Sequence, residues 1–346
     1  MKPFARPLVR AAATLILALA VTMGILFLAG APPVHTLAVL ATGSFGSSTA
    51  ILRTLSAMVP LLLCGAGLCL TFAVNLWNIG VEGQIILGSI GSLWVLRAWD
   101  ATGSVAPVLY QIGALLAAMA CGAAWALFSG LLRTHGRVHE IFSGLGLNFV
   151  ALGLSLWLIL GPWKRPGMAS MSGTEPLPAL LRLPAWGGRP MSLVGLVLAV
   201  CAFGLVAWLL RRTFFGLALT AVRHNPRAAA LLGLAPEKRM LAAMGLCGAL
   251  AGLAGGLLVA GLYHRLIPSI SGLYGYTAIL AVLMVSGSLP LLPLACLFFA
   301  ALTVGSIQLP LELGLDSSLS GVIQGVLLLL VFAVRRLRPT DAGRSA

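Results

Sequence analysis

The sequence predicts an all-α, polytopic membrane protein, and three features of its composition indicate this class. Hydrophobic residues make up 60% of the 346 residues, charged residues make up only 9%, and the mean hydropathy is +1.04. Soluble domains carry about 25% charged and about 45–50% apolar residues. The 22 basic and 8 acidic side chains are too few to cover a water-soluble fold. A soluble enzyme, a disordered chain and a coiled coil are therefore excluded.

Ten apolar runs along the chain predict about ten transmembrane helices, because one span needs about 20 predominantly apolar residues. They cover approximately 11–30, 52–74, 80–99, 106–132, 141–161, 191–210, 240–262, 273–289, 291–309 and 319–334. The first run follows a basic N-terminus, and its alternative interpretation is a secretory signal. We expect a retained helix, because the run exceeds the 7–15 residues of a signal core.

The basic residues predict that both termini are cytoplasmic. With the N-terminus inside, ten spans place 15 of the 22 basic residues on the cytoplasmic side, as the positive-inside rule requires. The net charge of +14 is thus attributed to orientation and not to nucleic-acid binding. The cytoplasmic set is Lys2, Arg6, Arg10, Arg133, Arg137, Arg211, Arg212, Arg223, Arg227, Lys238, Arg239, Arg335, Arg336, Arg338 and Arg344.

We expect one transmembrane domain over 1–346, with a first half at 11–162 and a second half at 191–335. Cys64-Gly65-Ala66-Gly67-Leu68 in one half is similar to Cys247-Gly248-Ala249-Leu250 in the other. The spans that carry them run in opposite directions, which indicates inverted repeats, although Gly and Ala are frequent in any membrane helix.

Two connections are long. Residues 163–190 are rich in Pro and Gly, which indicates an irregular external loop. Residues 211–239 form a basic cytoplasmic loop, in which the run from Arg227 to Leu232 predicts a short amphipathic helix after Pro226.

A polar segment interrupts the apolar sequence between the second and third spans. It holds Asn75, Asn78, Glu82 and Gln84, with Gly80 and Gly83 between them. Polar groups at membrane depth are costly, and irregular backbone is tolerated there only where it is buried in protein or lines a wet cavity. The segment therefore predicts a discontinuous region that faces a translocation pathway. The alternative is a short cytoplasmic turn with solvated side chains.

Aromatic residues near this segment have two interpretations. Phe72 and Trp77 could stack a nucleobase, or they could serve helix packing alone. No catalytic constellation accompanies them. The six cysteines lie in apolar runs, no His pair has metal-ligand context, and no GxxxxGK[ST] phosphate-binding loop occurs. We expect no enzyme activity, no cofactor and no metal, so that ATP dependence would have to come from a partner.

Four segments of the chain carry a recognisable pattern. They are Gly65 through Asn75 with Asn78-Ile79-Gly80 and Glu82-Gly83-Gln84; His139-Glu140-Ile141 with Leu147-Asn148; Phe215-Gly216, Ala221-Val222-Arg223, Asn225-Pro226, Ala228-Ala229 and Gly233; and the run Gly248–Gly255. Together they resemble the permeases of bacterial ABC importers for nucleosides, which belong to the basic-membrane-lipoprotein-type branch of the ribose and branched-chain amino acid permease family. The resemblance covers about residues 55–335.

The resemblance implies roles for two groups of residues. The predicted substrate pathway comprises Asn75, Asn78, Glu82, Gln84, Asn148, Phe72 and Trp77. The predicted ATPase-coupling element comprises Arg223, Asn225, Pro226, Arg227, Ala228, Ala229 and Gly233. Its spacing is similar to the Glu-Ala-Ala-x-x-x-Gly pattern of importer permeases, but Arg227 replaces the Glu, so an acidic contact to the ATPase is not assumed. The alternative is a basic loop held near anionic lipid.

We therefore expect the permease subunit of an ATP-driven nucleoside importer in the bacterial plasma (inner) membrane. The implied partners are ABC ATPase subunits, a soluble or lipid-anchored substrate-binding protein, a second permease copy or paralogue, and the lipid bilayer, with no nucleic acid. A permease for a sugar or other small polar solute is an alternative. An ion-coupled secondary transporter would need titratable groups deep in the spans, where only Glu82 qualifies, and a membrane enzyme would need a catalytic cluster.

Overall fold

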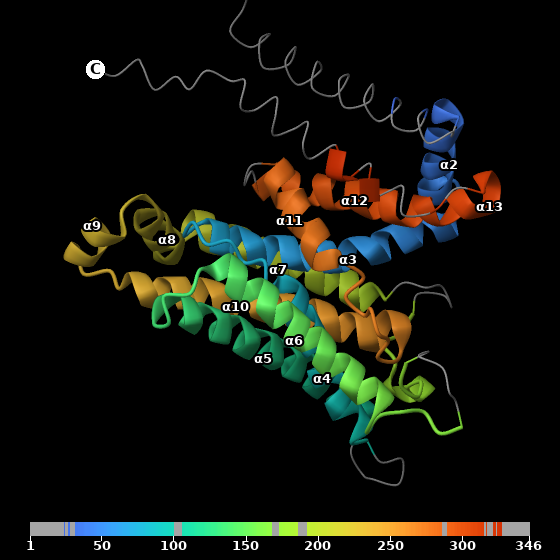
Figure 1. Cartoon of the computed structure of the whole chain (residues 1–346), viewed down its shortest axis with the longest axis horizontal. Helices are drawn as coiled ribbons and strands as arrows, with labels where there is room; N and C mark the ends of the chain where they lie inside the picture. The colour runs from blue at the N-terminus through green and yellow to red at the C-terminus, as the bar shows by residue number, and fades with distance from the viewer. Residues whose placement is uncertain are drawn as a thin grey trace, which may run out of the picture. The chain divides into compact units, whose positions relative to one another are not determined.

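The computed structural model describes residues 24, 27, 32–99, 106–167, 173–185, 192–285, 289–314, 316, 321–322 and 324–326. The regular secondary structure of these residues is helical, with no β-strand, which confirms the all-α prediction for the described part (Figure 1). The helices are α2 (Pro33–Phe45), α3 (Ser48–Phe72), α4 (Val81–Arg97), α5 (Pro107–Thr134), α6 (Glu140–Leu160), α7 (Leu193–Arg212), α8 (Phe214–His224), α9 (Pro226–Leu231), α10 (Pro236–Leu257), α11 (Tyr274–Met284), α12 (Leu292–Gly305) and α13 (Leu309–Leu313).

Six helical segments among the described residues are long and apolar enough to cross a membrane. They are Ser48–Phe72, Pro107–Thr134, Glu140–Leu160, Leu193–Arg212, Pro236–Tyr263 and Leu289–Leu313. α4, with 17 residues, and α11, with 11 residues, match predicted spans but are shorter. Most of the first and last predicted spans lies outside the described residues. A count of ten therefore stays a prediction.

The chain divides into two compact units. One comprises residues 1–54 and 297–346, and the other comprises Leu55–Cys296. Within the first unit, the Ser44 hydroxyl donates to the carbonyl of Ala301 at 2.6 Å. Every residue predicted for the pathway and for ATPase coupling belongs to the second unit.

The core of the second unit is a close packing of α4, α5 and α10. A Cβ added to Gly88 of α4 would clash with the backbone of Gly252 on α10, and one added to Gly122 of α5 would clash with Gly248 and Gly252. The Ser89 hydroxyl also donates to the carbonyl of Gly255 at 3.1 Å. Small residues allow the backbones of membrane helices to approach in this way. The Gly-rich run of α10 thus serves helix packing.

Two further contacts brace this unit. The Arg133 guanidinium pairs with the Glu140 carboxylate at 2.8 Å across the α5–α6 turn. The loop that we expect to be external is described over residues 173–185, where it contains a short 3₁₀ turn and bonds to the chain that follows the π-helical turn Leu258–Tyr263. There the Thr174 amide donates to Leu266 and the Leu177 amide donates to His264. These bonds fix the backbone of the described part of the loop.

Candidate functional site

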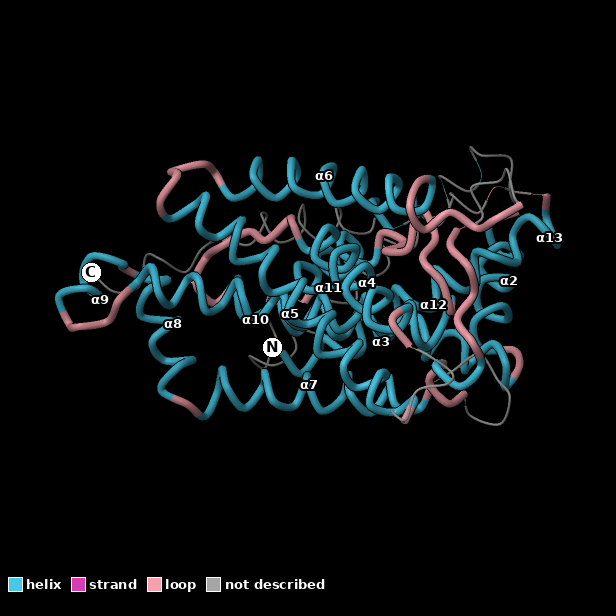
Figure 2. Tube along the Cα trace, turned by 90° about the horizontal axis from the view of Figure 1, so that it is seen from below, coloured by secondary structure: helices cyan, strands magenta, loops and turns pink. Residues whose placement is uncertain are grey.

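Two helix breaks define the centre of the second unit. α3 ends at Phe72 and α4 begins at Val81, with Asn75 left-handed between them at φ 59°. α10 continues into a π-helical turn at Leu258–Tyr263, after which the chain is irregular until α11 begins. The first turns of α4 and α11 meet, because Gly275 of α11 closely approaches the backbone of Glu82 in α4. Figure 2 labels both helices in the middle of the view. Discontinuous helices of this kind line the solute sites of transporters.

The side chains of Asn78 and Gln84 bond to each other. The Asn78 amide donates to Gln84 Oε1 at 3.1 Å, and the Gln84 amide donates to Asn78 Oδ1 at 2.9 Å. Asn78 also donates to Cys247 Sγ on α10 at 3.1 Å. Both amides are buried, at 2% and 0% exposure. A buried polar side chain needs such partners, so this pair fixes the break against the first turn of α4.

Asn148 of α6 joins three elements. Its Oδ1 accepts from the Gly83 amide at 2.8 Å, and its Nδ2 donates to the Ile79 carbonyl and to the Tyr276 hydroxyl, both at 3.0 Å. The prediction grouped Asn148 with the polar segment, and the structure brings them together. Tyr276 was absent from the predicted set, because nothing in its local sequence distinguishes it from an ordinary membrane aromatic residue.

Glu82 lies where α4 and α11 start. It is 5% exposed, and its Oε2 accepts from the Gly275 amide at 2.8 Å. Gly275 has no space for a side chain, because a Cβ there would lie 2.9 Å from the Glu82 nitrogen. The polar residues Asn78, Glu82, Gln84 and Asn148, with Tyr276 and Gly275, are called the polar junction below.

The other three predicted pathway residues lie at the α3 side of the break. Asn75 is exposed, Trp77 is 40% exposed, and Phe72 is half-buried. The rings of Phe72 and Trp77 pack against each other, with centroids 5.4 Å apart and planes tilted by 52°. The structure thus separates the predicted set into four buried polar residues and three residues that are accessible.

The segment that we expect to couple to the ATPase comprises α8, Asn225, α9, Leu232 and Gly233. It is called the coupling segment below, and it is organised by local capping. The Asn225 side chain accepts from the Ala228 amide at 3.1 Å, and Pro226 takes the first position of α9. At the other end Gly233 is left-handed at φ 80°, the Leu234 amide bonds to the Ala229 carbonyl, and the Gly233 amide bonds to that of Ala230. This is the Schellman arrangement that ends helices at glycine. The predicted short helix after Pro226 is confirmed.

The two faces of α9 differ sharply. Ala229 is only 2% exposed and packs inside the chain, whereas Leu231 and Leu232 are 90% and 80% exposed. Arg223, Asn225, Pro226, Arg227 and Ala228 are exposed as well. The small Ala229 side chain therefore faces the interior and leaves two leucines, which the sequence analysis did not select, as the apolar part of the outer face.

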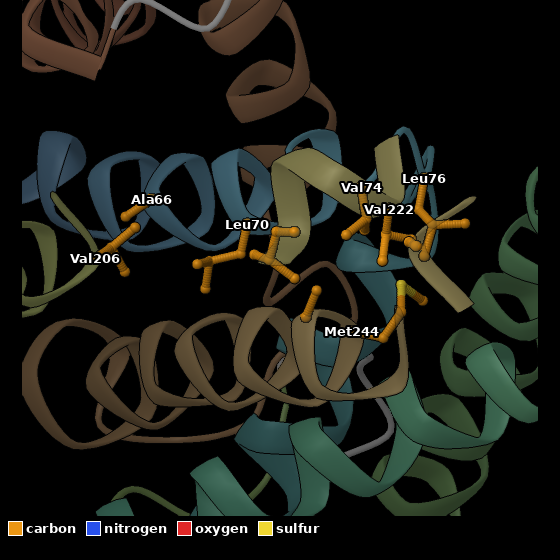
Figure 3. Close-up of a cluster of buried hydrophobic side chains, with 10 residues drawn as sticks. Ala66, Leu70, Val74, Leu76, Val206, Val222 and Met244 are labelled. Carbon is orange, nitrogen blue, oxygen red and sulfur yellow. The ribbon is translucent and has the colours of Figure 1, made fainter. Parts of the chain in front are cut away.

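Ala229 belongs to a buried hydrophobic cluster that reaches the first helix break (Figure 3). Val74 and Leu76 come from the break itself, Val222 from α8 and Met244 from α10. The complete cluster is Ala66, Leu70, Val74, Leu76, Val206, Leu219, Val222, Ala229, Ala243 and Met244. We call it the linking cluster. Because protein interiors are close-packed, a displacement of α9 would also shift the side chains of the break.

Comparison with known proteins identifies relatives over most of the chain. A guanosine ABC transporter permease of Bacillus subtilis is 25% identical over 94% of this chain and 92% of its own length. A glucose ABC transporter permease of Haloferax volcanii is 32% identical over 84% of this chain and 77% of its own. A nucleoside ABC transporter permease of Lactococcus lactis is 26% identical over 76% and 74%.

The family described as "Branched-chain amino acid transport system / permease component" matches residues 50–332. The match includes the polar junction, the linking cluster and the coupling segment. It agrees with the resemblance seen in the sequence, including its nucleoside branch. The chain is therefore a multi-pass membrane permease that belongs to this family of ABC transporter components.

Proposed function

We propose that this permease imports nucleosides into the cytoplasm and is driven by ATPase subunits that dock on the coupling segment. The observation that carries the proposal is the linking cluster, which joins Ala229 of α9 to Val74 and Leu76 of the helix break. An ATP-driven permease needs such a connection, because the motor lies outside the membrane and the solute passes inside it. The chain then needs no ATP site of its own.

The docking surface is the outer face of α8 and α9. Arg223 and Arg227 supply positive charge there, and Leu231 and Leu232 supply apolar area. Buried apolar anchors with a polar rim are the usual composition of a protein interface. Arg227 meets the ATPase as a cation in this proposal, in the place where the family pattern has an acid.

The solute is proposed to be a nucleoside because of the accessible end of the break. Trp77 and Phe72 present aromatic faces on which a base can stack, and Asn75 beside them offers both a donor and an acceptor. The guanosine and nucleoside relatives support this solute. A sugar is the second candidate, since one relative is a glucose permease. Asn78, Gln84 and Asn148 are bonded within the chain and hold the break in shape.

The remaining parts of the assembly are proposed with it. Two permeases, either two copies or this chain with a paralogue, enclose the pathway, and a soluble or lipid-anchored binding protein delivers the solute from outside. Both termini face the cytoplasm of a bacterial inner membrane, on the side of the coupling segment.

The test uses the exposed leucines. Leu231→Asp combined with Leu232→Asp removes the apolar anchors without touching the linking cluster, so the permease should insert normally. We expect loss of ATPase co-purification and at least a tenfold drop in uptake of labelled guanosine. Leu180→Asp is the matched control, because Leu180 is equally apolar and 65% exposed but lies in the external loop. Retention of the ATPase and normal uptake in the double variant would refute docking at this surface.

A further inference from the structure

Glu82 occupies an unusual position in the polar junction, because one carboxylate serves two helix starts. It belongs to the first turn of α4, and its Oε2 accepts from the Gly275 amide in the first turn of α11. Negative charge is favoured at a helix N-terminus, where unpaired N–H groups carry partial positive charge. Here a single side chain supplies that charge to both helices.

The two helix starts approach each other backbone to backbone. A Cβ on Gly275 would lie only 2.9 Å from the Glu82 nitrogen and 3.0 Å from its Cα. Two facing N-termini repel each other in a medium of low dielectric unless an anion lies between them. The amide of Gly275, in the first turn of α11, donates to the carboxylate that lies there. A backbone N–H at a helix start is the kind of donor that binds anions.

Among the described residues no cationic side chain forms an ion pair with the Glu82 carboxylate. The other oxygen, Oε1, is fully buried and accepts no hydrogen bond of standard length within the described chain. A buried carboxylate left in this way needs a reason to be there, and two helix ends that require an anion provide one.

We propose that the facing N-termini of α4 and α11 form an anion-binding site, which the chain fills with its own Glu82 carboxylate. A consequence, which rests on the proposed function, is that the solute passing the junction is uncharged. An anionic solute would find the helix ends already occupied and would meet a fixed negative charge. Discontinuous transporter helices that bind anionic solutes leave the same kind of N-terminus free for them.

Formate tests the site directly, because it is a carboxylate small enough to replace the missing side chain. Glu82→Ala should lower the unfolding midpoint of the detergent-purified, full-length permease. Added sodium formate should raise that midpoint in a dose-dependent way by about 2–4 °C. Formamide, which has the same shape without the charge, and sodium chloride at equal ionic strength should produce no comparable rise. Wild type should not respond to formate, because its site is filled.

The matched control is Ile85→Ala, which opens a cavity at a fully buried position just beyond the first turn of the same helix. It should be destabilised without any response to formate. Equal rescue by formamide, rescue of Ile85→Ala, or no rescue of monodisperse Glu82→Ala would overturn the proposal.

Glu82→Gln is a second, independent test of the anion site if Glu82→Ala does not fold. It preserves the shape and an acceptor for Gly275 but removes the charge, so its midpoint should fall below that of wild type. An unchanged midpoint would refute the need for an anion. Neither measurement involves transport. Formate rescue in a permease that does not carry nucleosides would therefore count against the proposed solute and leave the anion site standing.

Discussion

The polar junction and the coupling segment lie in one unit but are held by different kinds of contact. The junction holds polar side chains in the interior, and nearly every one is bonded to a residue far away in sequence, such as Glu82 to Gly275. The coupling segment is held by neighbours, through the Asn225 cap and the Gly233 turn, and leaves its apolar residues Leu231 and Leu232 exposed. The difference separates a region that keeps one internal arrangement from a region that we propose meets a partner.

The two regions are connected by the linking cluster. The linking cluster contains Val74 and Leu76 from the break that leads into the junction, and Ala229 and Val222 from the coupling segment. A force on the exposed face of α9 would therefore be transmitted to the break through packed side chains.

The largest effect is expected at Gly275. Gly275→Val would place a branched side chain against the backbone and carboxylate of Glu82, so that α11 must move away from α4. We expect a loss of about 1–3 kcal/mol in unfolding free energy and little residual uptake. Thermal unfolding in detergent and uptake in cells measure the two effects. Gly153→Val is the control, because no atom lies within 4 Å of a Cβ at Gly153. Equal behaviour of the two variants would exclude a close junction.

A smaller loss of uptake is expected from Ala229→Trp. Ala228→Trp, on the other face of α9, is its control. Ala229 is buried in the linking cluster and Ala228 is exposed. Overpacking at Ala229 should lower stability by about 1–3 kcal/mol and reduce the uptake obtained per ATP hydrolysed. Ala228→Trp should leave stability within about 0.5 kcal/mol of wild type. The ratio of uptake to ATP hydrolysis in proteoliposomes separates the pair, and an intact ratio in Ala229→Trp would break the link between the two regions.

The smallest effect is expected at Gly233. Its φ of 80° is left-handed, yet a Cβ there would have no atom within 4 Å. Gly233→Ala thus tests backbone conformation alone, at a cost of about 1 kcal/mol. We expect a lower unfolding midpoint and ATPase affinity reduced by a few-fold, measured by titrating the ATPase onto immobilised permease. Gly204→Ala in α7, where the added Cβ also meets no atom, should change neither. An unaltered affinity in Gly233→Ala would mean that the turn does not shape the docking surface.

Sequence reasoning succeeded where the controlling interactions are local. The short helix α9 follows from Pro226, the alanine run and Gly233, and the break before α4 follows from polar residues and glycines placed between apolar runs. Capping and backbone preference act over a few residues, so the sequence carries them visibly. The gathering of Asn148 with the break was suggested by family resemblance.

The parts that sequence reasoning missed depend on tertiary contact. Nothing near Gly275 indicates that it faces Glu82, which lies 193 positions away. The inward direction of Ala229 is decided by packing against α8 and α10, because an alanine run has no apolar stripe to orient it. The helix α2 and the π-helical turn after α10 were also not anticipated.

The central claim is that motion at the coupling segment reaches the helix break through the linking cluster. A fluorophore on Trp77→Cys, in a Cys201→Ser background that removes the one exposed native cysteine among the described residues, would report on the break. In the complex with its ATPase, addition of ATP should change the fluorescence. Leu76→Ala with Met244→Ala should loosen the cluster and abolish most of that change while the ATPase remains bound. A signal of full size in the loosened variant would contradict the account.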